Sequence, residues 1–286
     1  MSKRPSPLPA IAVFGQGIIG SRAADHIVAA GYPTKTWSRS PRERSDFEAD
    51  PVAAARGAAI VAIYLKDVPA VRDIFSTIEG ALGPGTTVVN HATVDYETTM
   101  FLVDRCSELG CDFLNAPFTG SKVAAGNAAL VYYAGGQAGV LKRIRSFLEV
   151  TSTQIMEVDS PLAATILKLT TNLITASTVQ ALAEGLSINL AHGISAETYL
   201  ESIKPNACAS VLAGMKVPSM AVGDFEPHFS LSNMLKDSRY MLDLAERAGL
   251  QAPGIANTAA QMQKRDEQGD GEFDFSILFR QFEPES

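Results

Sequence analysis

Two groups of residues in this sequence have types and spacings that could do chemistry. The first is the pair Lys168 and Asn172, four residues apart in an otherwise apolar, helix-like stretch. Side chains at positions i and i+4 share one face of a helix, so the two polar groups would lie together. An unpaired buried charge is costly, so this lysine needs a reason to be there. The residues alone leave two explanations open: a proton donor and acceptor, or a lysine whose stem reaches water at a domain edge.

The second group is a turn with the pattern G-x-G-x-x-G. Its residues are Gly15, Gln16, Gly17, Ile18, Ile19 and Gly20. The turn follows the apolar run 11–14 and opens a helical stretch, which is the context in which this pattern binds dinucleotides. The first glycine makes a tight turn, the second lets the backbone approach a pyrophosphate, and the third allows close helix–strand packing. The helix N-terminus adds N–H groups and partial positive charge. We therefore expect all six residues to bind a cofactor.

The residues after the second predicted strand, 34–37, indicate which dinucleotide binds. An NAD enzyme usually places Asp or Glu there to accept a hydrogen bond from the ribose 2′-hydroxyl. This chain has Ser38, Arg39 and Ser40 instead, and its next carboxylate is Glu43. The planar guanidinium of Arg39 suits a 2′-phosphate, and the serines offer hydroxyl groups. A solvated arginine at a strand end is the alternative, and we favour NADP over NAD.

These motifs need a scaffold, and the sequence predicts one in two parts. Short apolar runs alternate with helical stretches as far as residue 158, which favours a parallel sheet with helices on both faces. The expected strands are 11–14, 34–37, 59–64, 86–90, 111–115 and 130–134. Residues 162–192 contain no proline and one glycine, so they predict one long helix. Further helices are expected at 196–204, 207–217, 230–248 and 252–267. We expect an α/β Rossmann domain, 1–160, and an all-α C-terminal domain, 161–286, joined by the long helix.

Composition excludes several other classes of protein. The chain has 286 residues, 46% hydrophobic and 19% charged, as in a packed globule. Its net charge of -7 disfavours binding to nucleic acid or anionic membranes. Its three cysteines and four histidines have no metal-site or disulfide spacing, and reduced thiols are typical of the cytoplasm. No apolar signal-peptide core follows the proline-rich start, and the apolar region 161–192 carries Lys168 and Glu184. We expect a cytoplasmic protein without metal, nucleic-acid or membrane partners.

Six ordered blocks between about residues 10 and 280 carry a resemblance to a known family. They are Gly15–Gly20 with Ser38-Arg39-Ser40, Tyr64-Leu65-Lys66-Asp67, Asn90-His91-Ala92-Thr93, Asn115-Ala116-Pro117-Phe118-Thr119-Gly120-Ser121-Lys122, Lys168-x-x-x-Asn172, and Phe229 with Lys236-Asp237. In this order they resemble the β-hydroxyacid dehydrogenase family, which includes 3-hydroxyisobutyrate dehydrogenases and glyoxylate/succinic semialdehyde reductases. The sequence Thr-Gly-Ser-Lys is more similar to the semialdehyde reductase branch.

The resemblance implies an oxidoreductase that moves hydride between a nicotinamide and a small carboxylate-bearing aldehyde, ketone or β-hydroxyacid. It implies that Lys168 is the general acid and base and that Asn172 orients the substrate. The remaining implied contacts are Thr119, Gly120 and Ser121 to the substrate carboxylate, and Leu65, Thr93 and Lys236 to the cofactor. The site would lie between the two domains.

This sequence also departs from the family pattern. Ala92 lacks the usual hydroxyl group and Ser121 replaces a glycine, while Asp159 and Leu162 replace family glycines ahead of the lysine. These changes leave the substrate open. One alternative is an imine reductase, a class that resembles this family but typically lacks the lysine. The other is a nucleotide-binding scaffold without turnover, because a fold does not fix a function. The apolar long helix and the phenylalanine-rich stretch 266–286 predict a homodimer or homotetramer.

Overall fold

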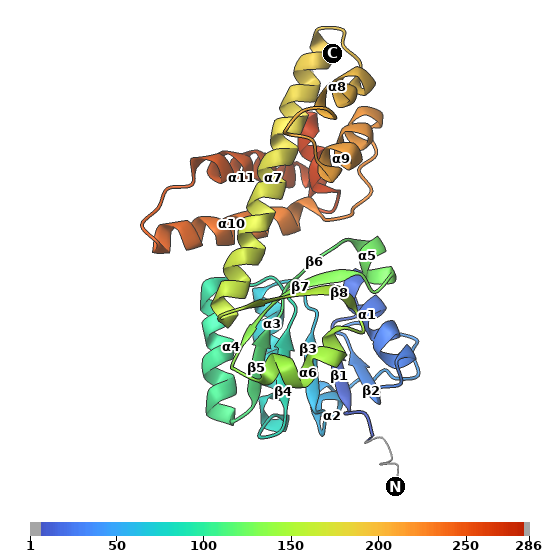
Figure 1. Cartoon of the computed structure of the whole chain (residues 1–286), viewed down its shortest axis with the longest axis vertical. Helices are drawn as coiled ribbons and strands as arrows, with labels where there is room; N and C mark the ends of the chain where they lie inside the picture. The colour runs from blue at the N-terminus through green and yellow to red at the C-terminus, as the bar shows by residue number, and fades with distance from the viewer. Residues whose placement is uncertain (1–6, 283–286) are drawn as a thin grey trace. The chain divides into compact units, whose positions relative to one another are not determined.

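Within residues 7–282, which the computed structural model describes, the first part of the chain forms an eight-stranded sheet (Figure 1). Residues 1–6, part of the start considered for a signal peptide, lie outside that range. The strand order is β2-β1-β3-β4-β5-β7-β6, and β8 pairs with β7. The strands are β1 Ile11–Phe14, β2 Thr34–Trp37, β3 Ile60–Ile63, β4 Thr87–Asn90, β5 Asp112–Asn115, β6 Phe118–Thr119, β7 Leu130–Gly136 and β8 Ser152–Val158. The central strands β1, β3 and β4 are fully buried, as expected for a sheet covered on both faces.

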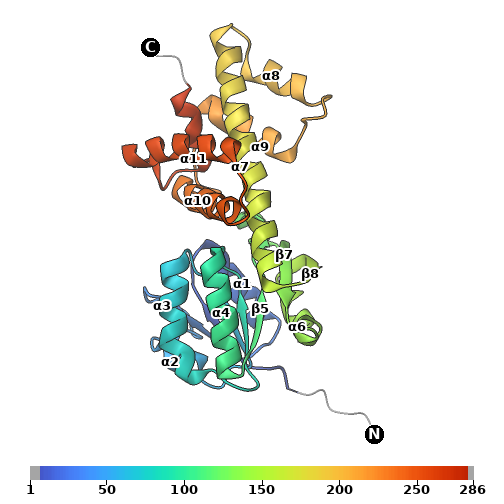
Figure 2. The ribbon, with the colours of Figure 1, turned by 90° about the vertical axis from the view of Figure 1, so that its left-hand side faces the viewer.

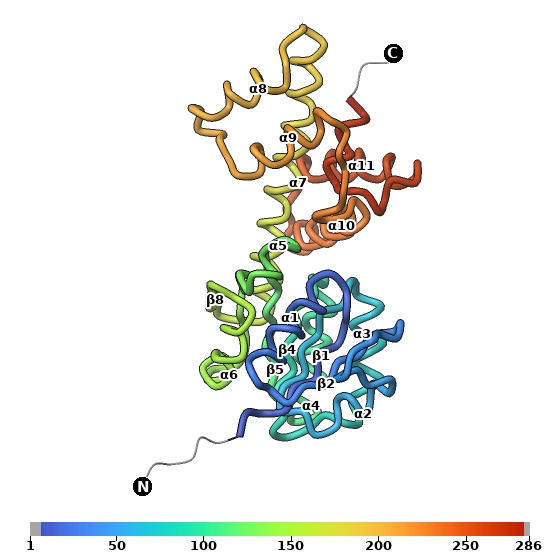
Figure 3. The backbone as a smooth tube through the Cα atoms, turned by 90° about the vertical axis from the view of Figure 1, so that its right-hand side faces the viewer, coloured from blue at the N-terminus to red at the C-terminus, as the bar shows by residue number. Residues whose placement is uncertain are grey.

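Helices cover both faces of this sheet. One apolar cluster joins the sheet to α1 (Ile18–Ala29), α5 (Lys122–Gly126) and α6 (Val140–Leu148). The opposite cluster joins it to α2 (Pro51–Ala55), α3 (Val68–Ile78) and α4 (Tyr96–Leu109). Figure 2 shows α3 and α4 side by side, and Figure 3 views the chain from the opposite side. Aspartates begin two of these helices: Asp67 accepts from Ala70 N at 3.0 Å and Asp95 from Thr98 N at 2.7 Å, as N-caps do.

The expectation of a wholly parallel sheet is wrong at one edge. β1 to β5 pair in parallel, but β7 is antiparallel to both β5 and β6. The segment between β5 and β7 contains only the short strand β6 and the five-residue helix α5, not a full crossover helix. Parallel neighbours need such a crossover, so the chain reverses direction here. The sequence prediction also missed β6 and β8.

The second part of the chain is helical, as predicted. It comprises most of α7 (Pro161–Ala191), then α8 (Ala196–Ile203), α9 (Val211–Val222), α10 (Leu231–Arg247), α11 (Pro253–Arg265) and the 3₁₀ segment η3 (Phe275–Gln281). The α9 helix lies several residues later than the predicted 207–217. Ser210 caps its start, left-handed Gly223 ends it, and Pro218 is tolerated inside it. The predicted class, an α/β Rossmann unit followed by an all-α unit, is confirmed.

The compact units of the chain meet within α7, between Lys168 and Leu169. The predicted boundary at 160/161 coincides with the first residue of that helix. Of the described helices, α7 alone is long and apolar enough to cross a membrane, with a mean hydropathy of 1.2 in its best window. A core helix passes the same test, and α7 residues pack in the apolar core of the second unit: Leu169, Ala176, Val179, Leu182, Ala183 and Leu186.

Candidate functional site

Several predicted site segments begin at one edge of the sheet. The register pairs Trp37 with Phe14, Phe14 with Ile63, Ile63 with Asn90, and Asn90 with Asn115. The turns that follow β1 to β5 therefore leave the sheet side by side at its carboxyl edge, where ligands of open α/β sheets bind. This edge gathers the predicted cofactor residues of the first unit, whereas Lys236 belongs to α10 in the second unit.

The glycine turn has the shape of a dinucleotide cradle. Gly15 has a φ of +102°, and a Cβ there would lie 2.3 Å from the carbonyl oxygen of Tyr64. A Cβ on Gly20 would lie 2.0 Å from the carbonyl oxygen of Gly15. Around Gly17, in contrast, no described atom lies within 4 Å of the Cβ position. No side chain caps the N-terminus of α1, so its N–H groups suit a pyrophosphate. Within residues 7–282, Gln16 Oε1 is buried without a partner. These residues fit a bound dinucleotide.

The segment after β2 carries the predicted 2′-phosphate residues. Ser38 Oγ donates to the carbonyl oxygen of Ser40 at 2.6 Å, and Arg39 is exposed. The nearby carboxylate of Asp46 is held by two hydrogen bonds from Arg44, of 2.8 and 2.9 Å, and Thr36 also donates to it. The hydrogen bonds and charge of Arg44 keep the pKa of Asp46 below its usual range. A carboxylate engaged in this way is a poor acceptor for a ribose 2′-hydroxyl.

The segments after β3 and β4 meet through a buried aromatic stack. The rings of Tyr64 and His91 lie 4.2 Å apart at an interplanar angle of 15°. His91 Nδ1 lies 2.8 Å from the carbonyl oxygen of Ala116, so the neutral ring carries its proton on Nδ1. Burial lowers the pKa of His91 to about 3, which makes a proton-transfer role at neutral pH unfavourable. Leu65 and Thr93, which are predicted to contact the cofactor, are both half-buried. Leu65 follows Tyr64 in the sequence, and Thr93 comes two residues after His91.

The predicted substrate loop is a single tight turn. Thr119 ends β6 opposite Val131 of β7, four residues before Gly135, which pairs with Asn115 of β5. The loop therefore lies beyond the carboxyl edge of β5. Gly120 has a φ of +134°, a conformation that favours glycine. Ser121 Oγ accepts from Ala124 N at 3.5 Å and caps α5, so its own proton can still be donated to a carboxylate.

Lys168 and Asn172 both lie on the buried face of α7, each 8% exposed. Asn172 Nδ2 donates to Asp237 Oδ2 at 2.7 Å. The Asp237 carboxylate is fully buried and also accepts from Lys236 Nζ at 2.8 Å. Asp237 belongs to the sixth block of the family resemblance, which assigns a cofactor contact to Lys236 but no role to Asp237. The structure gives it one, because it fixes the amide of Asn172.

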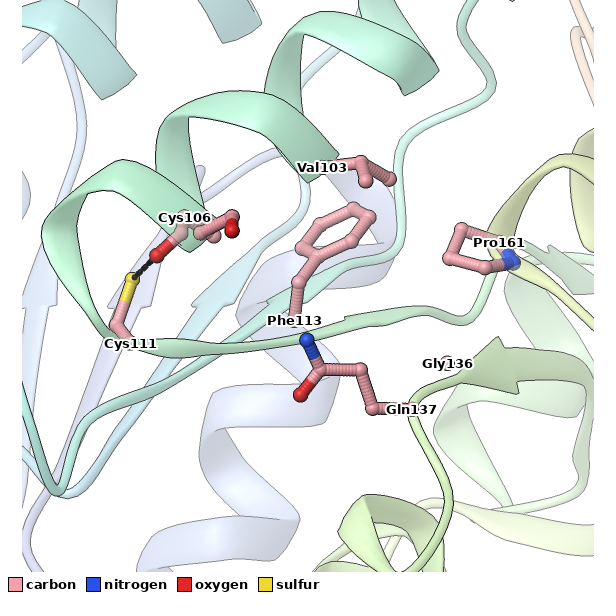
Figure 4. Close-up of a pocket in the computed structure, with 8 residues that line it drawn as sticks. Val103, Cys106, Cys111, Phe113, Gly136, Gln137 and Pro161 are labelled. Atoms are coloured by element: carbon pink, nitrogen blue, oxygen red, sulfur yellow. Dashed lines mark hydrogen bonds between the residues drawn. The ribbon is translucent and has the colours of Figure 1, made fainter.

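The hollow in Figure 4 lies elsewhere in the first unit and holds about 150 Å³. It is lined by Val103, Cys106, Ser107, Cys111, Phe113, Gly136, Gln137 and Pro161. None of the predicted site residues lines it. Cys111 Sγ donates to the carbonyl oxygen of Cys106 at 3.5 Å. Within residues 7–282, no group of three His, Cys, Asp or Glu side chains could hold a metal ion.

Comparison with known proteins agrees with this geometry. The family model described as the NAD binding domain of 6-phosphogluconate dehydrogenase matches residues 10–159. A second, described as NAD-binding of NADP-dependent 3-hydroxyisobutyrate dehydrogenase, matches residues 163–282.

Individual relatives are distant in sequence. Glyoxylate/succinic semialdehyde reductase 2, chloroplastic, of Arabidopsis thaliana is 24% identical over 264 residues, which are 89% of this chain and 74% of that protein. The cytokine-like nuclear factor N-PAC of Homo sapiens is 26% identical over 95% of this chain and 51% of its own length. The chain thus spans about half the length of N-PAC.

Solved structures show the same fold. The 3-hydroxyisobutyrate dehydrogenase of Mycobacterium tuberculosis, solved with L-serine, superposes with a TM-score of 0.88 at 23% identity, over 96% of this chain and 99% of that chain. An imine reductase from Pseudomonas sp. reaches a TM-score of 0.64 at 20% identity, over 96% and 99%. The first family match alone covers 150 of the 286 residues. The chain belongs to the β-hydroxyacid dehydrogenase family and is an NAD(P)-binding oxidoreductase.

Proposed function

We propose that this protein is an NADP-dependent reductase or dehydrogenase of a small carboxylate-bearing aldehyde, ketone or β-hydroxyacid. The observation that carries the proposal is the buried pair of Lys168 and Asn172 on one face of α7. Lysine and amide side chains are buried in proteins only where they are paired or hydrogen-bonded, so such a pair on an apolar helix marks a built site. A lysine is also the group that can supply a proton to an alkoxide and take it back.

In the proposed reaction, NADPH bound at the glycine turn supplies hydride to the carbonyl carbon. The Lys168 ammonium protonates the developing alkoxide oxygen, and the neutral amine takes the proton back in the oxidative direction. Asn172, whose amide is fixed by Asp237, orients the substrate. Thr119, Gly120 and Ser121 bind the substrate carboxylate through hydroxyl and backbone N–H groups.

The proposed cofactor is NADP(H) rather than NAD(H). Exposed Arg39 offers a fixed cation to the 2′-phosphate, and Ser38 and Ser40 lie beside it. The engagement of Asp46 by Arg44 supports this preference. We include Leu65, Thr93 and Lys236 among the cofactor-binding residues.

We also propose a homodimer or homotetramer that works in the cytoplasm. Support comes from large apolar side chains that the second unit exposes, among them Val211 at 82%, Val222 at 78%, Ile174 at 64% and Ile188 at 61%. Large apolar patches on a surface are typical of subunit contacts. Light scattering after size exclusion measures the assembly directly, and a monomer at micromolar concentration would contradict it.

The test of the reaction is NADPH oxidation with glyoxylate, succinic semialdehyde and a cyclic imine, on the wild type, Lys168→Ala and Lys142→Ala. Lys142 is exposed on α6 and serves as the matched control. We expect kcat for a carbonyl substrate to fall by roughly 10²–10⁴-fold in Lys168→Ala. NADPH binding should be kept. Imine turnover that survives Lys168→Ala would favour an imine reductase. A wild-type protein that binds NADPH but turns over none of the three substrates would favour a scaffold.

The test of the cofactor preference is Arg39→Ala, with exposed Arg56→Ala as the control. A charge-assisted hydrogen bond contributes about 1.5–3 kcal/mol, so the KM for NADPH should rise roughly 10-fold to 150-fold. The KM for NADH should stay unchanged. If the two constants rise equally, the assignment of Arg39 to a 2′-phosphate is wrong.

A further inference from the structure

A chain of buried, uncharged polar side chains runs through the first unit at the carboxyl edge of the sheet. Asn90 Nδ2 lies 2.8 Å from Asn115 Oδ1, and Asn115 Nδ2 lies 2.8 Å from Thr165 Oγ1. Thr165 Oγ1 in turn lies 2.8 Å from Thr99 Oγ1. The exposed fraction of each of the four side chains is 3% or less. These residues come from β4, β5, α4 and α7, and we call them the amide–hydroxyl chain.

The direction of every hydrogen bond in this chain can be worked out. Thr99 donates its only hydroxyl proton to the carbonyl oxygen of Asp95 at 2.9 Å, so Thr165 must donate to Thr99. The two protons of Asn115 Nδ2 go to Thr165 Oγ1 and to the carbonyl oxygen of Pro161 at 2.8 Å. Those of Asn90 Nδ2 go to Asn115 Oδ1 and to the carbonyl oxygen of Ala92 at 3.1 Å. All these donors are used, which fixes the two amide orientations.

Three members of the amide–hydroxyl chain lie next to parts of the proposed site. Asn90 bonds Ala92 through both ends of its amide, since its Oδ1 also accepts from Ala92 N at 3.2 Å, and this closes the turn that leads to Thr93. Asn115 precedes the segment that ends in the substrate loop. Thr165 and Pro161 belong to the first two turns of α7. Lys168 follows Thr165 by three residues, so the two lie on the same helix face.

We infer that Asn90, Asn115, Thr165 and Thr99 are positioning residues that set the first turns of α7, and with them Lys168, against the segments after β4 and β5. The two amides suit this task because each can donate twice and accept at once. A carboxylate at position 115 could not donate to Thr165 or to Pro161. The family block that resembles this segment begins with Asp, so Asn115 is a feature of this chain. The inference rests on the proposed role of Lys168.

The test compares Thr165→Val with Thr165→Ser and with Thr98→Val as the matched control. Thr98 is the neighbour of Thr99 on α4, is fully buried, and accepts from Arg72 Nε at 3.0 Å outside the amide–hydroxyl chain. Thr165→Val keeps the shape of the side chain but removes the link between Asn115 and Thr99. A misplacement of about 1 Å at a reacting group can cost up to about 10²-fold, so we expect kcat to fall roughly 10-fold to 100-fold. Thr165→Ser should restore it.

The readouts are kcat and the KM for NADPH with the best carbonyl substrate, together with urea unfolding. The inference expects a loss in kcat at unchanged KM in Thr165→Val, and none in Thr98→Val even where its stability falls. If the amide–hydroxyl chain serves stability alone, Thr165→Val and Thr98→Val will both lower the free energy of unfolding and leave kcat unchanged. That result overturns the inference. Lys168→Ala, measured in parallel, separates the proposed function from this inference. If Lys168→Ala keeps its activity, both are wrong. If Lys168→Ala loses its activity but Thr165→Val keeps its kcat, only the inference is wrong.

Discussion

The Rossmann unit buries a histidine in its neutral form, whereas the helical unit buries a lysine and an aspartate as a charged pair. In the Rossmann unit, fully buried His91 lies in an aromatic stack, and its pKa of about 3 keeps it neutral. In the helical unit, Lys216 and Asp274 form an ion pair of 2.6 Å between Nζ and Oδ1, with side chains only 5% and 2% exposed. One arrangement avoids charge, and the other neutralises it.

The two arrangements make the units lose stability in different ways. Besides the hydrogen bond from Lys216, the Asp274 carboxylate accepts four more. Its donors are His228 N and Phe229 N at Oδ2, and Ser276 N and Ser276 Oγ at Oδ1. Burial alone would raise the pKa of Asp274, and Lys216 and Ser276 outweigh it and hold the pKa below its usual range. The buried ion pair is therefore sensitive to the loss of either partner, whereas buried neutral His91 is sensitive to acid.

The largest expected effect follows from removing half of the ion pair. Asp274→Ala leaves the Lys216 ammonium buried without its carboxylate, and breaking a buried pair in this way costs about 3–5 kcal/mol. Urea unfolding measures the loss. The control is Glu201→Ala, which breaks the exposed pair of Lys204 and Glu201 and should cost at most about 1 kcal/mol.

The double replacement Lys216→Met with Asp274→Leu sharpens this prediction. An apolar pair of similar volume can replace a buried ion pair at little cost, so the double variant should be more stable than Asp274→Ala. If Asp274→Ala loses no more stability than Glu201→Ala, the ion pair is not what the helical unit depends on.

The next effect concerns acid. The unfolded chain protonates His91 near its ordinary pKa of 6.5, but the folded chain does so only near 3. The unfolded state therefore binds the extra proton between these values, and stability is lost as the pH falls from 6.5 toward 3, by at most about 1.4 kcal/mol per pH unit. His91→Phe keeps a ring against Tyr64 and should remove this dependence.

The Asp274 carboxylate should affect the free energy of unfolding in a lower pH range than His91. Its folded pKa lies below its ordinary value of 3.8, so its contribution is complete above that value and is lost as the pH falls through the lowered pKa. Unfolding free energies of wild type, His91→Phe and Asp274→Asn, measured from about pH 7 down to about pH 2, separate the two contributions. Identical slopes for wild type and His91→Phe between pH 6 and 4 would contradict the first.

Sequence reasoning reached the framework of both units but not these pairings. The apolar runs at 11–14 and 59–64 match β1 and β3, because a strand buried on both faces is apolar at every position. The β8 strand was missed because it is mostly exposed and polar. The strand β7 was predicted at 130–134, but its antiparallel direction was not, because no local period encodes the direction of a neighbouring strand.

The candidate site shows the same limit. Residue types and order were enough to select Lys168, Asn172 and the glycine turn. Their partners were not predictable, since Asn115 and Thr165 are 50 residues apart and Asn172 and Asp237 are 65 apart. Contacts at such separations depend on how the elements pack, which local patterns do not report.

The smallest expected effect tests whether burial, rather than the number of bonds, makes the helical ion pair important. Arg44 donates two hydrogen bonds to Asp46 and one to Asp25. The side chains of Arg44, Asp46 and Asp25 are 19%, 14% and 65% exposed, against 5% and 2% for Lys216 and Asp274. An ion pair that solvent reaches contributes less than a fully buried one, so Arg44→Ala should cost less than Asp274→Ala, about 1 kcal/mol in urea unfolding. The same variant should also weaken the proposed preference for NADPH over NADH, because it frees the Asp46 carboxylate to accept a hydrogen bond. A loss as large as that in Asp274→Ala would mean that bond number, not burial, decides the difference between the two units.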